Sequence, residues 1–399
     1  MKVFVQFEKL LTWTFLYRDK PFKLHSIRLP NSVLNFTCIA PLLALVALMA
    51  HKIYFVMSND GNFEDISDPV YMSIGAISIT LSYLSYARNI PLIILIIRST
   101  QTIVQKRVNE CNHGIYEVAK LKFGKLMQRI YLLEFSVIMT IFTVPVLAPI
   151  ATEVFDCKRL RKLWFTPYPV AAWWDITNVP GYYLSILIQI LSTISYMAVV
   201  SIMITFSFGI YTYINAAVDD LQTIMNTIDQ TIIQETNAIQ NRMNAKRLMY
   251  KLIELHQEYL KIFRMFATIS SGPIFFQFIV YTAFIALNLF RFERTFNELN
   301  YSAIPNLNTL FIQILFNYVT CSYASNVTAK LSSVADIAYN SIWHKYSIEM
   351  EKLLLLVIQC SQAPYIITGY GIINCSLDTF VLLIRSATSY FVVIRKLSH

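Results

Sequence analysis

The chain has 399 residues, of which 56% are hydrophobic and 14% are charged, and its mean hydropathy is +0.50. Soluble domains carry about 25% charged residues, so this composition lacks the polar surface that water requires, and it excludes a disordered or nucleic-acid-binding protein. The net charge of +9 is the expected consequence of basic cytoplasmic loops beside membrane spans.

Apolar runs long enough to cross a bilayer recur along the whole chain. A helix needs roughly 20 such residues to cover about 30 Å of hydrocarbon. We therefore predict a single all-α membrane domain over residues 1–399 with seven transmembrane helices. The approximate spans are 33–56, 70–97, 127–150, 182–212, 264–290, 304–328 and 372–395.

The distribution of lysine and arginine predicts the orientation of this bundle. The loop 57–69 carries only acidic charges, whereas most positive charges fall on the other side of the predicted spans. The basic run 158–162 is an exception to this pattern. Because cytoplasmic loops are enriched in Lys and Arg, we expect the N-terminus in the cytoplasm and the C-terminus outside the cell. The basic segments are 1–32, 98–128, 242–264 and 330–352.

This orientation argues against a G-protein-coupled receptor, which shares the span count but places its N-terminus outside the cell. The third predicted span is not followed by Asp-Arg-Tyr, and the seventh lacks Asn-Pro-x-x-Tyr. A transporter is the next alternative, and we find none of the internal repeats that many transporters contain.

No group of residues indicates catalysis or metal binding. The six cysteines and six histidines are dispersed, with no CxxC, HExxH, Walker loop or GxGxxG. We therefore predict that the chain is not an enzyme and uses no cofactor or metal. Only Cys157 falls in a predicted outer segment, so we expect no disulfide framework. The outer sequon at Asn300 is the candidate for glycosylation.

The stretch 213–262, between spans four and five, is predicted to be helical rather than a loop. Its apolar residues recur every three or four positions, as they do on one face of a helix. We interpret it as a cytoplasmic extension of span four followed by a helix that leads into span five. Their apolar stripes need a partner, either the short run 353–358 or another subunit.

Several stretches of the second half of the chain follow one another in a distinctive order. The outer loop contains Phe165-Thr-Pro-Tyr-Pro, and the segment 332–343 ends in Tyr-x-x-x-Trp. Gln359-Cys-Ser-Gln-Ala-Pro follows, and then Leu377-Asp-Thr-Phe with Ser389-Tyr-Phe-Val-Val-Ile. In order and spacing these stretches resemble the insect odorant receptor family.

The resemblance implies an odorant-tuning subunit in olfactory sensory transduction. Such a subunit assembles with the odorant receptor co-receptor into a heterotetrameric, ligand-gated, non-selective cation channel in the plasma membrane of sensory dendrites. The extended cytoplasmic helices would then form an intersubunit anchor region. The family's co-receptor has a longer insertion between spans four and five. The alternative is a gustatory-type homotetramer, whose last span typically contains Thr-Tyr and Gln-Phe; here Thr388 precedes Ser389-Tyr390.

The resemblance also places a pocket for a small hydrophobic volatile in the outer half of the bundle. Affinity there would come from apolar burial, at about 25 cal/mol per Å². Packing between helices is the alternative role for each candidate. The candidates are Tyr71, Ile74, Ile77, Ile138, Phe142, Tyr183, Leu187, Phe311, Leu315 and Tyr318.

In the resembled family the last span of each of four subunits surrounds the pore. Val393 and Leu397 match the apolar gate, and their spacing puts them on one helix face. Ser386, Ser389 and Lys396 lie near that face. A ring of four Lys396 ammonium groups would oppose cation flow, which favours a heteromeric channel. The alternative is an ordinary lipid-facing helix.

Two charges inside predicted spans suggest a structural ion pair. Arg88 and Glu134 fall in the inner thirds of spans two and three, which are antiparallel neighbours in the predicted topology. Arg385 has no evident partner in the sequence. The run Thr368-Gly-Tyr-Gly is similar to a potassium-channel filter, but we interpret its glycines as a turn before the last span.

Overall fold

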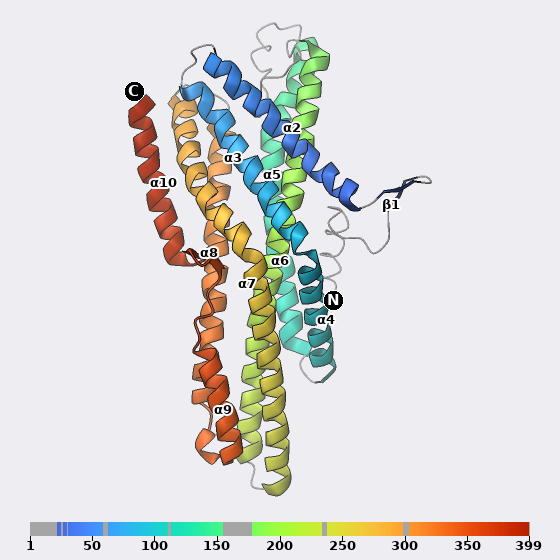
Figure 1. Cartoon of the computed structure of the whole chain (residues 1–399), viewed down its shortest axis with the longest axis vertical. Coiled ribbons are helices and arrows are strands. Elements are labelled where there is room, and N and C mark those ends of the chain that lie inside the picture. The colour runs from blue at the N-terminus through green and yellow to red at the C-terminus, as the bar shows by residue number, and fades with distance from the viewer. Residues whose placement is uncertain are drawn as a thin grey trace.

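The computed structural model describes residues 22–24, 27–29, 31–58, 63–110, 113–154, 178–233, 238–297 and 303–398. Within these ranges the chain is almost entirely helical, and the long helices form one elongated bundle (Figure 1).

The described elements follow one another along the chain in this order. The hairpin of β1 (Phe22–Leu24) and β2 (Ile27–Leu29) comes first. A 3-10 turn, Trp343–Lys345, and the hairpin of β3 (Thr368–Gly369) and β4 (Ile373–Asn374) flank α9. The helices are α2 (Asn31–Ser58), α3 (Phe63–Arg88), α4 (Ile90–Glu110), α5 (His113–Val154), α6 (Val179–Ile233), α7 (Ala238–Asn297), α8 (Ala303–Tyr339), α9 (Ile348–Ser361) and α10 (Leu377–Ser398).

The helix ends that the basic-loop pattern predicts on the same side of the membrane lie at the same end of the bundle. The C-terminal ends of α2 and α7 and the N-terminal ends of α3 and α8 lie at the top of Figure 1, the end predicted to be outside the cell. The C-terminal end of α6, the N-terminal end of α7 and the whole of α9 lie at the bottom, the end predicted to be cytoplasmic.

By length and hydropathy, fewer helices of the structure qualify as membrane spans than the seven spans predicted from the sequence. Among the described residues, four helices are long and apolar enough to cross a bilayer, namely α2, α6, α7 and α10. The bent pair of α3 and α4 adds a fifth if it is counted as one span. The predicted spans 127–150 and 304–328 lie within α5 and α8. In α8, the buried amides of Asn306 and Asn317 reduce the apolar character of the helix.

Two predicted span boundaries differ from the structure. The range 70–97 is divided at Asn89, where the axes of α3 and α4 differ by 66°. Pro91 explains the break, because its ring has no N–H and clashes with the carbonyl four residues earlier. The Asn89 side-chain amide donates to the Ser85 carbonyl at 2.8 Å, which satisfies an acceptor at the break. The last helix begins at Leu377 instead of 372, because the β3–β4 hairpin precedes it.

The hairpin confirms that Thr368-Gly-Tyr-Gly forms a turn. Tyr370 and Gly371 have φ values of 50° and 71°, the left-handed region that suits tight turns. Gly369 packs directly on α7, since a Cβ there would lie 2.8 Å from the backbone nitrogen of Phe275. The Tyr370 N–H donates to the Ser271 hydroxyl at 2.7 Å, which fastens the turn to the same helix.

The hydrophobic core runs along α6, and aromatic rings join it to the neighbouring helices. The ring centroids of Phe208 and Tyr323, on α6 and α8, are 4.7 Å apart. Those of Tyr211 and Phe266, on α6 and α7, are 5.4 Å apart. Edge-to-face pairs of this kind add to the energy of apolar burial, so three long helices share one packed seam.

The prediction of helices over 213–262 is confirmed, because the described residues of this stretch belong to α6 and α7. The run 353–358 lies in α9, where Leu354 and Val357 are buried. Leu355 and Leu356 on the same helix are exposed, so α9 covers part of the apolar stripe and presents a further apolar face. We call the cytoplasmic parts of α6 and α7, together with α9, the anchor region.

A buried histidine joins two helices of the anchor region. His256 on α7 is 3% exposed, and its Nε2 lies 3.0 Å from the Ser361 hydroxyl of α9. Burial lowers the pKa of His256 from 6.5 to about 4. The unfolded chain therefore takes up this proton at a higher pH than the folded chain does, and folding becomes less favourable as the pH falls from 6.5 towards 4.

We predict that acidification from pH 7 to pH 4.5 destabilises the protein by up to about 3 kcal/mol through His256 alone. His256→Gln should reduce that pH dependence, since glutamine can bond to Ser361 without titrating. His344→Gln, at an exposed position of the same region, is the matched control. Thermal melting of the purified protein at both pH values measures the effect. Equal pH dependence in wild type and His256→Gln would contradict the prediction.

Candidate functional site

The candidate pocket residues lie on α3, α5, α6 and α8, in varied environments. Phe142 is buried, whereas Ile77, Leu187, Phe311 and Tyr318 are 47 to 59% exposed on the single chain. The side chain of Tyr71 lies outside the described residues. The half-buried members of the set are Ile74, Ile138, Tyr183 and Leu315.

One candidate belongs to a packed layer that crosses the bundle. Ile74 contacts the cluster of Phe284 and Leu287 on α7, and Ile394 of α10 packs against the same cluster. The approach is close because of Gly75, where an added Cβ would meet the Phe284 ring at 2.2 Å. Phe284 and Gly75 were not among the sequence candidates. The layer connects the predicted pocket helix α3 to the predicted pore helix α10.

Other pocket candidates do not converge on Ile74. The Tyr318 ring lies 5.6 Å from the Phe380 ring of α10, measured between centroids. The Tyr183 ring packs edge-on against its neighbour Tyr182 at 5.9 Å. Tyr318 is thus placed beside the predicted pore helix, and Tyr183 near the start of α6.

The candidate pore residues share one side of α10, the side that this chain leaves uncovered. Leu383 and Ala387 are buried and turn towards the bundle. Ser386, Ser389, Val393 and Lys396 are all exposed, while the side chain of Leu397 lies outside the described residues. Figure 1 shows α10 standing at the edge of the bundle, next to α7 and α8.

The basic residues of α10 have different surroundings. The Arg395 guanidinium reaches back to the bundle, where its Nη2 lies 3.1 Å from Glu293 Oε1 of α7. Arg385 is exposed and lies on the same side as Ser389 and Lys396. The predicted pair of Arg88 and Glu134 stays a prediction, since Arg88 is exposed at the end of α3 and the Glu134 side chain lies outside the described residues.

The structure contains a different, buried ion pair, which the sequence did not predict. Arg107 of α4 donates from Nε to Asp220 Oδ2 at 2.7 Å and from Nη2 to Oδ1 at 2.9 Å. The Tyr116 hydroxyl of α5 donates to the same carboxylate at 3.1 Å. The side chains of Arg107 and Asp220 are 13% and 0% exposed. Two bonds from one guanidinium and one from a phenol hold α4 and α5 against α6.

The sequence did contain a signal for this pair. Asp220 falls three residues after Ala217 and four before Ile224, at core positions of the apolar stripe on α6. A carboxylate at such a position requires a buried partner. Its neighbour Asp219 points elsewhere and pairs with Lys330, where both side chains are 40% or more exposed.

Three comparisons relate the chain to known proteins. A family model described as 7tm Odorant receptor matches residues 62–388. A 79-residue segment is 32% identical to Odorant receptor 49a of Drosophila melanogaster, and the match covers 20% of this chain and 20% of that relative.

The olfactory receptor OR5 from Machilis hrabei, solved in complex with eugenol, aligns over 99% of both chains with a TM-score of 0.74 and 12% identity. A second structure of that receptor aligns over 98% of both chains with a TM-score of 0.70 and 11% identity. At these identities the likeness shows the fold, and the predicted all-helical membrane fold with seven spans is confirmed.

The geometry of the buried ion pair generates a stability prediction. Asp220→Asn should cost about 3 to 5 kcal/mol, because it leaves a buried guanidinium without its counter-charge. Lys106→Met is the matched control, because Lys106 immediately precedes Arg107 on α4 and forms an ion pair of its own. The Lys106 pair with Glu254 is 2.8 Å long but about half exposed on both sides, and its loss should cost less than about 1 kcal/mol.

Thermal unfolding of the purified variants measures both costs. Replacing the pair by Arg107→Met with Asp220→Leu should restore part of the stability lost in Asp220→Asn, because no unpaired charge then stays buried. Equal melting temperatures for Asp220→Asn and Lys106→Met would refute this account of the site.

Proposed function

The chain belongs to the odorant receptor family, and on that premise we propose that it is an odorant-tuning subunit that gates a non-selective cation channel together with the family's co-receptor. Its ligand in this proposal is a small hydrophobic volatile. The exposed side of α10 is the observation that carries the channel role.

The composition of that side does not suit a helix surrounded by lipid. Only 11% of the residues in the α10 span are buried within the chain. Its open side carries Arg385 within the span, together with Ser389, and Lys396 at the outer end of the span. A charged residue inside a span, such as Arg385, normally faces a bundle interior or a water-filled path. Several copies of α10 around an aqueous path would hydrate these groups, with Val393 as an apolar constriction that stops ions by dewetting.

The positive charges favour a heteromer. Lys396 and Arg385 lie about three helical turns apart on the same side of α10. Four copies of each around one pore would repel cations at two levels. Mixing this subunit with a partner that lacks these charges reduces that repulsion, which supports the co-receptor as partner.

Two further observations support ligand gating. The layer of Ile74, Phe284 and Ile394 provides packed contact between α3 and α10, and a ligand that bound the open arrangement more tightly would shift the gate by that difference in affinity. The Machilis hrabei receptor of the same fold is in complex with eugenol, which supports a small-molecule ligand for this chain as well.

Assembly would also use the anchor region at the cytoplasmic end. The exposed side chains of Ile348, Leu355 and Leu356 give α9 an apolar surface that a neighbouring subunit would cover. A receptor-channel of this kind would reside in the plasma membrane, in the dendrites of olfactory neurons.

Co-expression in oocytes tests the proposal. We expect odour-evoked cation currents under a panel of volatiles when the chain is expressed with a co-receptor, and no current when it is expressed alone. Surface labelling verifies that the chain reaches the plasma membrane. A receptor that reaches the surface with the co-receptor and yields no current with any volatile would contradict the channel role. Currents from the chain alone would favour the gustatory-type homotetramer.

A charge substitution tests the orientation of α10. Lys396→Gln should increase the inward single-channel cation current of the heteromer by up to about fivefold, since one charge close to a hydrated ion contributes about 1 kcal/mol. Arg395→Gln removes the same charge one residue earlier, from a side chain that pairs with Glu293, and should leave conductance unchanged. Equal effects of the two substitutions would place Lys396 away from the ion path.

A further inference from the structure

A groove of about 970 Å³ lies between α5, α6 and α8. It is lined by residues of 114–126, 212–219 and 323–333. The predicted span of α5 begins at 127, and those of α6 and α8 end at 212 and 328, so the groove lies at the predicted cytoplasmic boundary of the membrane. A molecule in this groove would lie where phospholipid headgroups border the hydrocarbon.

The lining of the groove becomes more polar towards the cytoplasm. On α8 it begins with Tyr323 inside the predicted span and continues to Lys330 and Ser333, about two and three helical turns further on. On α6 it ends at Asp219, about two turns beyond Thr212. A phospholipid has the same order of parts, with acyl chains on the membrane side and a polar headgroup on the water side.

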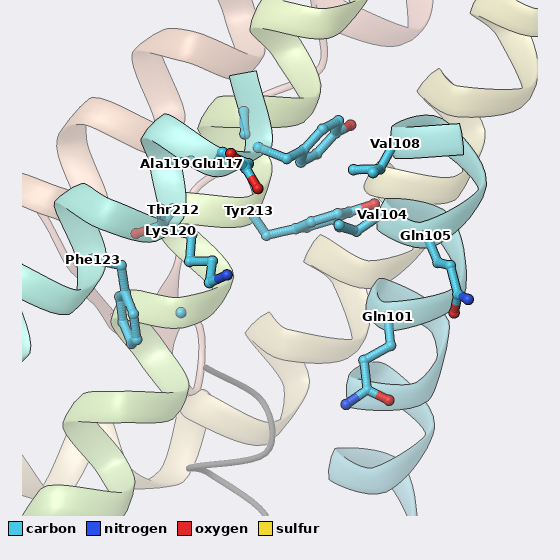
Figure 2. Close-up of a pocket in the computed structure, with 13 residues that line it drawn as sticks. Gln101, Val104, Gln105, Val108, Glu117, Ala119, Lys120, Phe123, Thr212 and Tyr213 are labelled. Carbon is cyan, nitrogen blue, oxygen red and sulfur yellow. The ribbon is translucent and has the colours of Figure 1, made fainter. Parts of the chain in front are cut away.

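The charges that line the groove leave one cation without a counter-charge. Lys330 Nζ lies 2.6 Å from Asp219 Oδ1, so these two residues neutralise each other. Lys122 also lines the groove, and it is exposed and forms no ion pair within the described part of the chain. Glu117 on the same helix lines a different cavity, between α4, α5 and α6 (Figure 2). The groove therefore has a net positive charge and favours an anion.

Two further cations extend this positive charge along α5. Lys125 and Arg129 lie three and seven residues after Lys122, so all three project from one side of the helix, and all three are exposed. At 1.5 Å per residue, Lys122 and Lys125 lie about 8 and 3 Å outside the predicted start of the span, and Arg129 lies about 3 Å inside it. The headgroup region is about 5 to 8 Å thick on each side of the bilayer. The three side chains are therefore at the depth of phospholipid phosphates. We call them the basic edge of α5.

We propose that the groove and the basic edge together bind an anionic phospholipid of the cytoplasmic leaflet. The headgroup contacts the ammonium and guanidinium groups of the basic edge, and one acyl chain lies in the groove between α5 and α8. Such a lipid uses both the cations and the apolar part of the groove, whereas a free phosphate would use the cations alone. Its binding would hold α5, α6 and α8 together at the membrane boundary. The proposal does not depend on the channel role.

Photolabelling of the full-length receptor tests the site. The receptor is placed in nanodiscs of dioleoylphosphatidylcholine that contain a phosphatidylserine or a phosphatidylcholine probe, each with a diazirine on its acyl chain. Labelled peptides are mapped by mass spectrometry. We expect the phosphatidylserine probe to label 114–126 and 323–333 at least about fivefold more than the phosphatidylcholine probe does. Equal labelling of these segments by the two probes, or label from both probes only elsewhere, overturns the proposal.

Removing the basic edge should abolish this preference. The combined variant Lys122→Gln, Lys125→Gln and Arg129→Gln should lower labelling by the phosphatidylserine probe to about the level of the phosphatidylcholine probe. Labelling by the phosphatidylcholine probe should not change, because that lipid has no net charge. The three side chains are exposed, so the variant should keep the melting temperature of the wild type. Undiminished labelling by the phosphatidylserine probe would contradict the proposal.

The matched control removes three positive charges far from the predicted membrane. Arg242 and Arg247 of α7 lie about 33 and 26 Å before the predicted start of its span, and Lys345 lies beyond the cytoplasmic end of α8. Replacing all three by Gln should leave labelling unchanged, because salt screens charges over about 8 Å. A loss of labelling as large as that of the basic-edge variant would mean that total charge attracts the lipid, and the proposed site would then be wrong.

A fourth variant tests the position of the acyl chain. Ala329 of α8 lines the groove and is exposed, so the larger side chain of Ala329→Trp has room to enter it. This variant should reduce labelling of 114–126 and 323–333 by both probes at least about threefold. Labelling equal to that of the wild type would place the acyl chain outside the groove and refute the proposed arrangement.

Discussion

The structure depends on continuous burial along α6, which runs the length of the bundle. Ile214, Ala217, Leu221 and Ile228 are all fully buried, and they lie in the part of α6 that the basic-loop pattern places in the cytoplasm. Inside a bilayer, apolar burial between helices gains little because lipid tails are equally apolar. In water the same burial gains the full hydrophobic effect. The anchor region is therefore the part of the fold where hydrophobic burial is most stabilising.

Polar side chains along this core find their hydrogen-bond partners in two different ways. A hydroxyl such as that of Thr212 bonds to a carbonyl one turn earlier on its own helix, so this bond joins no second helix. Asp220 cannot be satisfied in this way and needs Arg107 and Tyr116 from two other helices. One carboxylate therefore fixes the position of α4 and α5 relative to α6, which apolar contacts alone specify weakly.

The sequence predicted the features that follow from periodicity and charge. The helices over 213–262 are long, amphipathic segments with a clear three-to-four spacing, and the structure contains them. The bend at Asn89 was not predicted, because Pro91 lies within a continuous apolar run although it stands at the start of a new helix. The partner of Asp220 is 113 residues away, and no local pattern encodes such a distance. For the pocket candidates the difficulty is different: spans that are apolar on every side give no sign of which side faces inward, so Ile77 and Phe311 could not be told from Phe142.

In a single subunit, α9 and α10 each expose side chains that their surroundings disfavour, and the two helices do so in opposite ways. In the anchor region, α9 exposes Leu355 and Leu356 to water, where apolar surface is unfavourable. In the predicted membrane span, α10 exposes Arg385, where charge is unfavourable beside lipid. In the proposed heteromer, neighbouring subunits would correct both, by covering the leucines of α9 and by enclosing water beside α10. A contact at one end alone would correct only one of these deficits, so the proposed channel needs contacts between subunits at both ends.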